Sequence, residues 1–319
     1  MKVKAQEDIS KTKGNGKFSL FKAIGNTPLV ELRNLNGNSK VRILGKLEGS
    51  NPGGSVKDRP AYYMIIKAEE SGKLTRDKTI VEPTSGNMGI ALAMIGAARG
   101  YRVKLFMPEC VSTERQRTLA ALGADVTLTP AEEGTDGAIT RARQLVSEEA
   151  EKYFMPNQFD NPANVLAHYE TTGPEILSQT NGEVDVFVAG MGTTGTLMGT
   201  GKYLKEKKRG LKVVAVEPTI GHTIQGLKNM NESIVPKIYR PETFDEKVAV
   251  EDEKAFETTR LLAVNEGLFV GMSSGAAVAG ALNIAKNLNS GTIVVILPDR
   301  GDRYLSTTLF RSFCAKCPP

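Results

Sequence analysis

The chain has 319 residues, 40% of them hydrophobic and 24% charged, a composition typical of a folded globular protein and not of a disordered or fibrous one. Its formal net charge is only +5 and is spread along the chain, which argues against a nucleic-acid-binding surface. No apolar run is long enough to cross a membrane, and residues 1–17 lack the apolar segment of a secretory signal, so we expect a cytoplasmic protein with a flexible arm over residues 1–20.

Strand-like and helix-like segments alternate along the whole chain. The expected strands are residues 41–47, 79–82, 102–107, 125–129, 184–189, 213–217 and 292–297. The expected helices are residues 56–71, 113–122, 137–151, 253–266 and 275–288, with two more that end near residues 99 and 208. Short buried strands in alternation with helices predict mostly parallel sheets with helices on both faces. A polar stretch with a proline at residues 159–162 separates two such series and predicts a domain boundary.

In sheets of this kind ligands bind beyond the carboxyl ends of the strands, where this sequence carries four glycine-bearing loops. The first, residues 49–59, places Lys57 in the first turn of a helix. The positive end of the helix dipole and partial burial would both lower the pKa of this amine, which would then be a nucleophile suited to Schiff-base chemistry. The alternative is an exposed lysine that tolerates the dipole.

Two of the other loops combine hydroxyl side chains with a helix N-terminus. The second loop holds Thr84, Ser85 and Asn87 between a strand and an apolar helix, and these polar groups suit a carboxylate or a phosphate. The fourth loop holds Ser273 at the start of another apolar helix. In both loops the alternative is a set of helix N-caps without a ligand.

The third loop, residues 190–196, matches the G-x-G-x-x-G pattern of dinucleotide-binding folds. Glu217 ends the next strand 22 residues after Gly195, where such folds place the acid that binds the ribose. A nicotinamide or flavin enzyme is therefore a rival interpretation. The loop's threonine hydroxyls favour a phosphate monoester instead, because they add side-chain donors to the backbone amides. These threonines are Thr193, Thr194 and Thr196.

The three cysteines, Cys110, Cys314 and Cys317, are too few for a disulfide scaffold and fit a reducing compartment. The last two form a C-x-x-C near the end of the chain, without a second pair of ligands for zinc. We expect a tail with two exposed thiols and no metal site. A site shared between subunits is the alternative.

Together these loops resemble the cysteine synthase family of fold-type II pyridoxal-phosphate (PLP) enzymes, and most closely its cysteine synthase B branch. The resemblance is carried by residues 24–29, 46–48, 51–59, 84–87, 158–163, 172–176, 190–196 and 299–307. It implies two doubly wound, mostly parallel α/β domains with the active site between them. The smaller domain would comprise residues 50–160, with a mobile part at about residues 83–150 around the second loop. The larger would comprise residues 21–49 and 161–319.

The resemblance also implies a role for each loop in binding pyridoxal 5′-phosphate. Lys57 would hold the cofactor covalently and act as the general base on the substrate α-proton. Asn87 would donate a hydrogen bond to the cofactor's 3′-oxygen. Ser273 would face the pyridine nitrogen, where a serine does not hold the ring protonated and so favours elimination. The phosphate would be bound by Gly192, Thr193, Thr194, Gly195 and Thr196.

The implied reaction replaces the β-substituent of O-acetylserine or O-phosphoserine by a sulfur nucleophile through an α-aminoacrylate intermediate. The nucleophile would be sulfide, thiosulfate or the thiocarboxylate of a sulfur-carrier protein, and the enzyme would be a homodimer. The substrate carboxylate would be bound by Thr84, Ser85, Asn87 and Gln158.

Two positions depart from the family pattern or vary within it. Met88 stands where most of the family has threonine, so only its backbone N–H remains to meet the substrate carboxylate. Lys228 lies where the cysteine synthase B branch commonly has arginine, and we expect it to contact an anionic group of a substrate or sulfur donor. The alternative for Lys228 is a surface lysine.

Three other functions remain as alternatives. Another fold-type II enzyme, such as a cystathionine β-synthase-like enzyme or a serine/threonine dehydratase, would share the cofactor. An NAD-dependent oxidoreductase would use the third loop. A non-catalytic binding protein is disfavoured because Lys57, Asn87 and Ser273 are all present.

Overall fold

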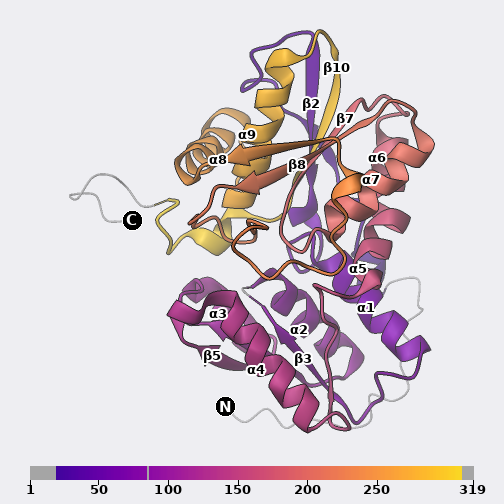
Figure 1. The fold of residues 1–319 in the computed structure, drawn as a ribbon, viewed down its shortest axis with the longest axis vertical. Helices are drawn as coiled ribbons and strands as arrows, with labels where there is room; N and C mark the ends of the chain where they lie inside the picture. Colours follow the sequence, from indigo (N-terminus) through magenta and orange to yellow (C-terminus); the bar gives the residue numbers. More distant parts are fainter. Residues whose placement is uncertain (1–18, 85, 311–319) are drawn as a thin grey trace, which may run out of the picture.

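The computed structural model describes residues 19–84 and 86–310, which form two β-sheets covered by helices (Figure 1). Ser85, the cysteines at 314 and 317, and residues 1–18 of the predicted arm lie outside the described residues. Within those ranges, no helix is both long and apolar enough to cross a membrane.

The larger sheet has the strand order β1-β2-β10-β7-β8-β9. Its strands are β1 (Leu29–Glu31), β2 (Val41–Leu47), β7 (Val186–Gly190), β8 (Lys212–Pro218), β9 (Glu246–Val250) and β10 (Gly291–Leu297). Only β1 runs antiparallel to its neighbour, and the other pairs are parallel. Figure 1 shows α8 (Asp252–Glu266) and α9 (Met272–Asn287) on one face of this sheet, and α6 (Gly173–Gln179) and α7 (Gly195–Lys207) on the other.

Consecutive side chains of a central strand enter different cores. Val294 of β10 packs in the core that includes Leu197 of α7, whereas Val295 packs in the core that includes Val278 of α9. Both faces of the strand are therefore buried, which is why its sequence is a continuous apolar run.

The smaller sheet has the order β5-β4-β3-β6, with all pairs parallel. Its strands are β3 (Thr79–Pro83), β4 (Val103–Pro108), β5 (Asp125–Thr129) and β6 (Tyr153–Phe154). One face packs against α1 (Asp58–Glu70), α2 (Asn87–Arg99) and α3 (Thr113–Ala121), and the other against α4 (Gly134–Glu148). The predicted α/β class with mostly parallel sheets is confirmed, while the predicted domain bounds and the mobile part stay predictions.

The link between the two sheets contains a short helix, α5 (Pro162–Ala167), and a π-helix (His168–Thr172) that runs directly into α6. Neither was predicted from the sequence. A glycine in α7 explains the close packing here, because a Cβ on Gly199 would lie 2.2 Å from the carbonyl oxygen of Val165. The two helices therefore touch through backbone.

A buried ionic network ties the first turn of α1 to the larger sheet. Arg59 lies 2.7 Å from Glu48, which directly follows β2, and 2.6 Å from Glu175 of α6. Lys46 of β2 lies 2.7 Å from the same Glu175. The side chains of Arg59, Glu48 and Lys46 are at most 1% exposed, so this network is part of the protein interior.

Candidate active site

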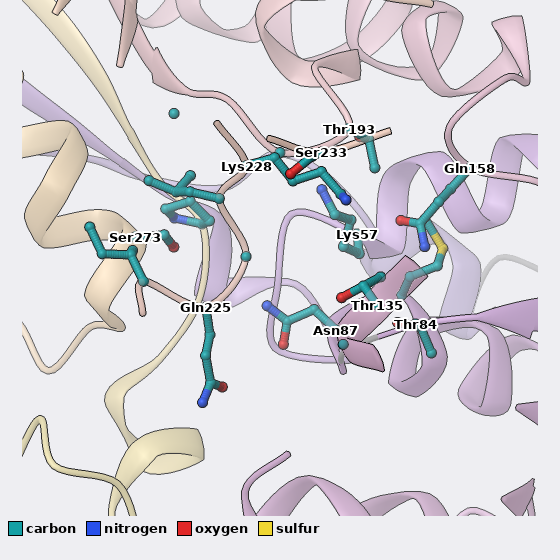
Figure 2. A pocket seen from close by; sticks show the side chains of 18 of the residues that line it. Lys57, Thr84, Asn87, Thr135, Gln158, Thr193, Gln225, Lys228, Ser233 and Ser273 are labelled. Carbon is teal, nitrogen blue, oxygen red and sulfur yellow. The ribbon is translucent and has the colours of Figure 1, made fainter. Parts of the chain in front are cut away.

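A cavity of about 430 Å³ lies between the two sheets, beyond the carboxyl ends of β3, β7 and β10. Figure 2 shows its labelled side chains converging from both halves of the molecule. The predicted site residues that line it are Lys57, Thr84, Asn87, Met88, Gln158, Gly192, Thr193, Thr194, Thr196, Lys228 and Ser273. Gly195 does not line the cavity. It packs against Asn164, since a Cβ added to Gly195 would lie 2.0 Å from the Asn164 side chain.

Lys57 is the N-cap residue of α1, and its amine points into the cavity (Figure 2). Burial lowers the pKa of this amine to about 8, although the charge of Asp299 works in the opposite direction. The loop before it is fixed to the larger sheet, since the backbone N–H of Val56 donates to Pro298 at 2.8 Å and Ser55 pairs with Asp299. Burial is therefore the main cause of the lowered pKa.

Asn87 is the first residue of α2, and its side-chain amide lies on the cavity wall. Its Nδ2 donates to Asp299 Oδ2 at 2.6 Å, and its Oδ1 accepts a hydrogen bond from Arg303. The preceding Gly86 has φ of 150°, and a Cβ there would lie 2.4 Å from the Arg115 side chain. Only glycine fits this turn, so the helix start is held close to Arg115.

The loop of residues 190–196 forms a tight cradle at the N-terminus of α7. A Cβ on Gly192 would lie 2.4 Å from the Gly226 carbonyl oxygen, so two backbones approach closely. Thr194 adopts a left-handed conformation with φ of 70°, which is uncommon for a β-branched residue, and its buried hydroxyl has no partner among the described residues. Thr193 accepts a hydrogen bond from Asn164 at 3.1 Å. Thr196 lies 3.2 Å from His168 Nε2.

Ser273 lies in the first turn of α9 and is 4% exposed. Its side chain lines the cavity on the wall that also carries Gln225 (Figure 2). The predicted fourth loop therefore reaches the same cavity as the other three. Four loops that are far apart in the sequence meet at one place.

The predicted carboxylate-binding residues lie together on the side of the smaller sheet. Thr84 accepts a hydrogen bond from the backbone of Gly86 at 3.1 Å. Gln158 donates to the carbonyl oxygen of Pro83 at 3.2 Å and is 4% exposed. Met88 is 2% exposed and packs in the core of the smaller sheet, so its side chain cannot replace a threonine hydroxyl.

Lys228 faces the cavity from the larger half of the molecule. Its Nζ lies 3.5 Å from Asp136 Oδ1 of α4 and 5.3 Å from the centre of the Phe159 ring. Its side chain is 13% exposed, so the interpretation as an ordinary surface lysine is disfavoured. The ion pair between Lys228 and Asp136 joins the two halves of the molecule at the cavity wall.

Sequence reasoning gave no role to Arg115, which lines the cavity, or to Asp299, Arg303 and Tyr304, which lie next to its wall. Arg115 is buried and lies 4.6 Å above the Tyr304 ring, and it also donates to Gln225. The sequence offered one signal for three of them, because residues 299–307 are among the segments that resemble the cysteine synthase family. That signal does not say which residues these side chains contact.

The acid expected for a dinucleotide site lies elsewhere. Glu217 accepts a hydrogen bond from the backbone of Met230 at 3.0 Å and forms an ion pair with Lys247 at 2.7 Å. Glu217 is 4% exposed and is not part of the cavity wall. Its carboxylate is thus already paired, which argues against the oxidoreductase interpretation of the third loop.

Comparison with known protein families gives a match over residues 20–299 to the family described as pyridoxal-phosphate dependent enzymes. The chain belongs to this family. It is therefore a PLP-dependent enzyme, and the resemblance found in the sequence is confirmed.

Named relatives are similar over nearly their full length. Cysteine synthase B of Salmonella typhimurium is 45% identical over 292 residues, which is 92% of this chain and 96% of that protein. The crystal structure of cysteine synthase from Entamoeba histolytica superposes with a TM-score of 0.87 at 40% identity, covering 96% of this chain and 94% of that one. An O-acetylserine-dependent cystathionine β-synthase from Helicobacter pylori gives 0.87 at 38% identity, covering 92% and 99%.

The residues of the cavity fit pyridoxal phosphate. A monoester phosphate needs several donors, and the buried Thr194 hydroxyl has no partner among the described residues beside the N-terminus of α7. An aldehyde needs a neutral amine, and the lowered pKa of Lys57 provides one near neutral pH. We infer that Lys57 would hold the aldehyde carbon and that residues 192–196 would hold the phosphate.

Proposed function

We propose that this enzyme is a cysteine synthase that replaces the β-substituent of O-acetylserine or O-phosphoserine by a sulfur nucleophile. The observation that carries the proposal is the position of Lys57, whose lowered-pKa amine shares one cavity with Asn87, Ser273 and the 192–196 loop. The 45% identity to cysteine synthase B supports the choice of reaction.

Bound pyridoxal phosphate supplies an electron sink for charge that develops at the substrate α-carbon. The chain's own task is to move the proton. Nζ of Lys57 takes the proton from the α-carbon and returns it at the end of the turnover. A pKa of about 8 suits both directions, because such an amine is neutral in part of the molecules at neutral pH and can be reprotonated.

Ser273 sets the strength of the electron sink. Its hydroxyl would face the ring nitrogen of a bound cofactor as a neutral group, and so would stabilise a positive charge there less than a carboxylate would. A weaker sink favours prompt loss of the β-substituent over transamination.

The substrate carboxylate is bound at the start of α2, where Thr84, Asn87 and the backbone N–H of Met88 are near Gln158. A carboxylate at a helix N-terminus is stabilised by the helix dipole and by free N–H groups. Because the Met88 side chain is packed in the core, the site has one hydroxyl donor fewer than a threonine would provide.

Lys228 distinguishes anionic substrates from neutral ones in this proposal. The Lys228→Ala variant should lower kcat/KM for O-phosphoserine by about 10- to 100-fold, because a charged hydrogen bond is lost. The value for O-acetylserine should change by less than about threefold, since no charge is involved there. Lys237, 80% exposed and 3.7 Å from Asp160, is the matched control for loss of a lysine. The role would be excluded if Lys228→Ala lowered kcat/KM for O-phosphoserine no more than kcat/KM for O-acetylserine.

Two measurements test the reaction itself. The purified protein should be yellow, and borohydride should bleach it and leave a reduced adduct on the peptide that contains Lys57. In a separate assay, the untreated enzyme should yield cysteine from O-acetylserine and sulfide. Formation of cystathionine from homocysteine, at a higher rate than cysteine, would favour the activity named for the Helicobacter pylori relative. An adduct on another lysine would refute the proposed site.

We also propose that the enzyme is a cytoplasmic homodimer and that a sulfur-carrier protein is one of its donors. The family resemblance supports the dimer, and the low number of cysteines supports a reducing compartment. Light scattering of the holoenzyme should give twice the 34.4 kDa mass of the chain. A monomer at micromolar concentration would contradict the proposed assembly.

A further inference from the structure

The two ends of an asparagine side chain have nearly the same shape but opposite hydrogen-bonding character. Oδ1 only accepts hydrogen bonds, whereas Nδ2 only donates them. The orientation of the Asn87 amide therefore decides whether it can donate to an oxygen anion in the cavity. The neighbours of Asn87 settle this orientation.

Asn87 lies between one obligatory donor and one obligatory acceptor. The Arg303 guanidinium can only donate, and it meets Asn87 Oδ1. The Asp299 carboxylate can only accept when ionised, and its Oδ2 lies 2.6 Å from Asn87 Nδ2. A flipped amide would place the carboxylate against an oxygen and the guanidinium against an NH₂ group. Only one orientation is compatible with both neighbours.

The two neighbours are themselves held in place. Asp299 is 1% exposed, and Tyr304 donates a second hydrogen bond to its Oδ2 at 2.6 Å. Its backbone pairs with Ser55, two residues before Lys57, and its carbonyl oxygen accepts from Gly271, two residues before Ser273. The side chain of Arg303 also donates to the carbonyl oxygen of Gly53. Asp299 is thus in contact with the loops that carry Lys57, Ser273 and Asn87.

Asp299 and Arg303 follow β10 of the larger sheet, whereas Asn87 begins α2, which packs on the smaller sheet. We propose that Asp299 and Arg303, the Asn87 clamp, are positioning residues that fix this amide so that its remaining Nδ2 hydrogen donates to an oxygen anion of the bound pyridine ring. The inference rests on the proposed cofactor site, but not on which reaction the enzyme catalyses. It assigns a function to residues that do not touch the cofactor themselves.

A double-mutant cycle on PLP binding tests the clamp without any turnover. The apoprotein is titrated with PLP, and the dissociation constant and the visible absorption maximum of the complex are measured. Asn87→Ala and Asp299→Ala should each weaken binding about tenfold, because each removes the same cofactor hydrogen bond. The double variant should bind within about twofold of Asn87→Ala, since Asp299 acts through Asn87.

Losses that multiply to about a hundredfold in the double variant would overturn the proposal, because they would mean that Asp299 acts independently of Asn87. Arg303→Ala provides a second cycle with Asn87→Ala and decides the question alone if Asp299→Ala does not fold. Asp302→Ala is the matched control, since the side chain of Asp302 is 49% exposed and forms an ion pair with Arg300. Its dissociation constant and absorption maximum should equal those of the parent.

The coupling between Asn87 and the clamp can be measured even if the enzyme does not catalyse the proposed reaction. An enzyme that binds PLP but forms no cysteine would still show coupling between Asn87 and the clamp. Conversely, a cysteine synthase with additive effects of Asn87 and Asp299 would refute the clamp and keep the function.

Discussion

Thr194 combines two features that destabilise the protein without its cofactor. Its left-handed backbone is unfavourable for a β-branched residue, and its hydroxyl is buried without a partner among the described residues. A phosphate in the loop would give this hydroxyl a partner. The substitution Thr194→Gly should therefore stabilise the apoprotein and weaken PLP binding, two effects of opposite sign.

The expected magnitudes follow from the local structure. Relief of backbone strain contributes about 1–3 kcal/mol, and removal of an unpartnered buried hydroxyl about 1–3 kcal/mol. Glycine loses about 1 kcal/mol through the greater entropy of the unfolded chain, and the missing Cβ and methyl carbons cost about 0.8 kcal/mol each. We expect the free energy of unfolding of the apoprotein to rise by about 1–2 kcal/mol. The PLP dissociation constant should rise about 10- to 100-fold with the loss of a hydroxyl donor to the phosphate.

Urea denaturation of the apoprotein and titration with PLP measure the two effects separately. Thr194→Ala keeps the left-handed strain and loses the hydroxyl, so it should weaken binding equally but stabilise less. Asn181→Gly is the control for a left-handed residue outside the cavity, since Asn181 has φ of 51° and is exposed. An apoprotein of Thr194→Gly that is no more stable than the parent would refute the strain argument. Unchanged PLP affinity would refute the phosphate site.

Three further predictions concern buried charges. Burial lowers the pKa of Lys57 from 10.5 to about 8, so between these pH values the unfolded chain binds a proton that the folded chain does not. The free energy of unfolding of the apoprotein, measured by urea denaturation, should therefore rise from pH 8 to 10.5. The Lys57→Met variant should not show this rise. Burial raises the pKa of Glu82 from 4.5 to about 7, so as the pH rises this carboxyl loses its proton at a lower pH in the unfolded chain than in the folded one. The free energy of unfolding should therefore decline from pH 4.5 to 7. The Glu82→Gln variant should not show this decline. Arg59→Met leaves Glu48 and Glu175 buried without their main partner and should lower the free energy of unfolding by about 3–5 kcal/mol, measured from the urea midpoint.

Exposed residues provide the controls for the Lys57 and Arg59 substitutions. Lys67→Met, at a side chain that is 51% exposed, should keep the parent's pH profile. Arg141→Met breaks an exposed ion pair with Glu133 and should change stability by less than about 1 kcal/mol. An equal loss in Arg141→Met and Arg59→Met would contradict the argument from burial.

The sequence predicted the central strands and the edge strand β5 well, but missed the other three edge strands. Strand β10 is buried on both faces and therefore has a continuous apolar run, which can be recognised from the sequence alone. Strands β1 and β6 were missed because they have three and two residues, and their backbone pairing to a neighbour defines them. Strand β9 was missed because its residues alternate between exposed and buried next to charged side chains. Pairing with a distant strand leaves no local pattern.

The same distinction applies to the site. Lys57, Asn87 and Thr194 could be found because each follows a strand in a loop with a local glycine pattern. Arg303 could not, since it contacts Asn87 across 216 residues and belongs to a short, charged segment that suggests solvent exposure. The sequence also placed no constraint on the Asn87 amide orientation, which depends on three side chains meeting in space.

The ionic network around Arg59 has a consequence for motion. The body of α1 packs with the smaller sheet through Ala61 and Met64, but its first turn is bonded to Glu48 beside β2. If the smaller sheet rotates when substrate enters, the start of α1 is the expected pivot. Lys57 would then stay almost still during opening and closing, and so would Asn87 while Asp299 and Arg303 hold it, whereas the far end of α1 would move with the smaller sheet.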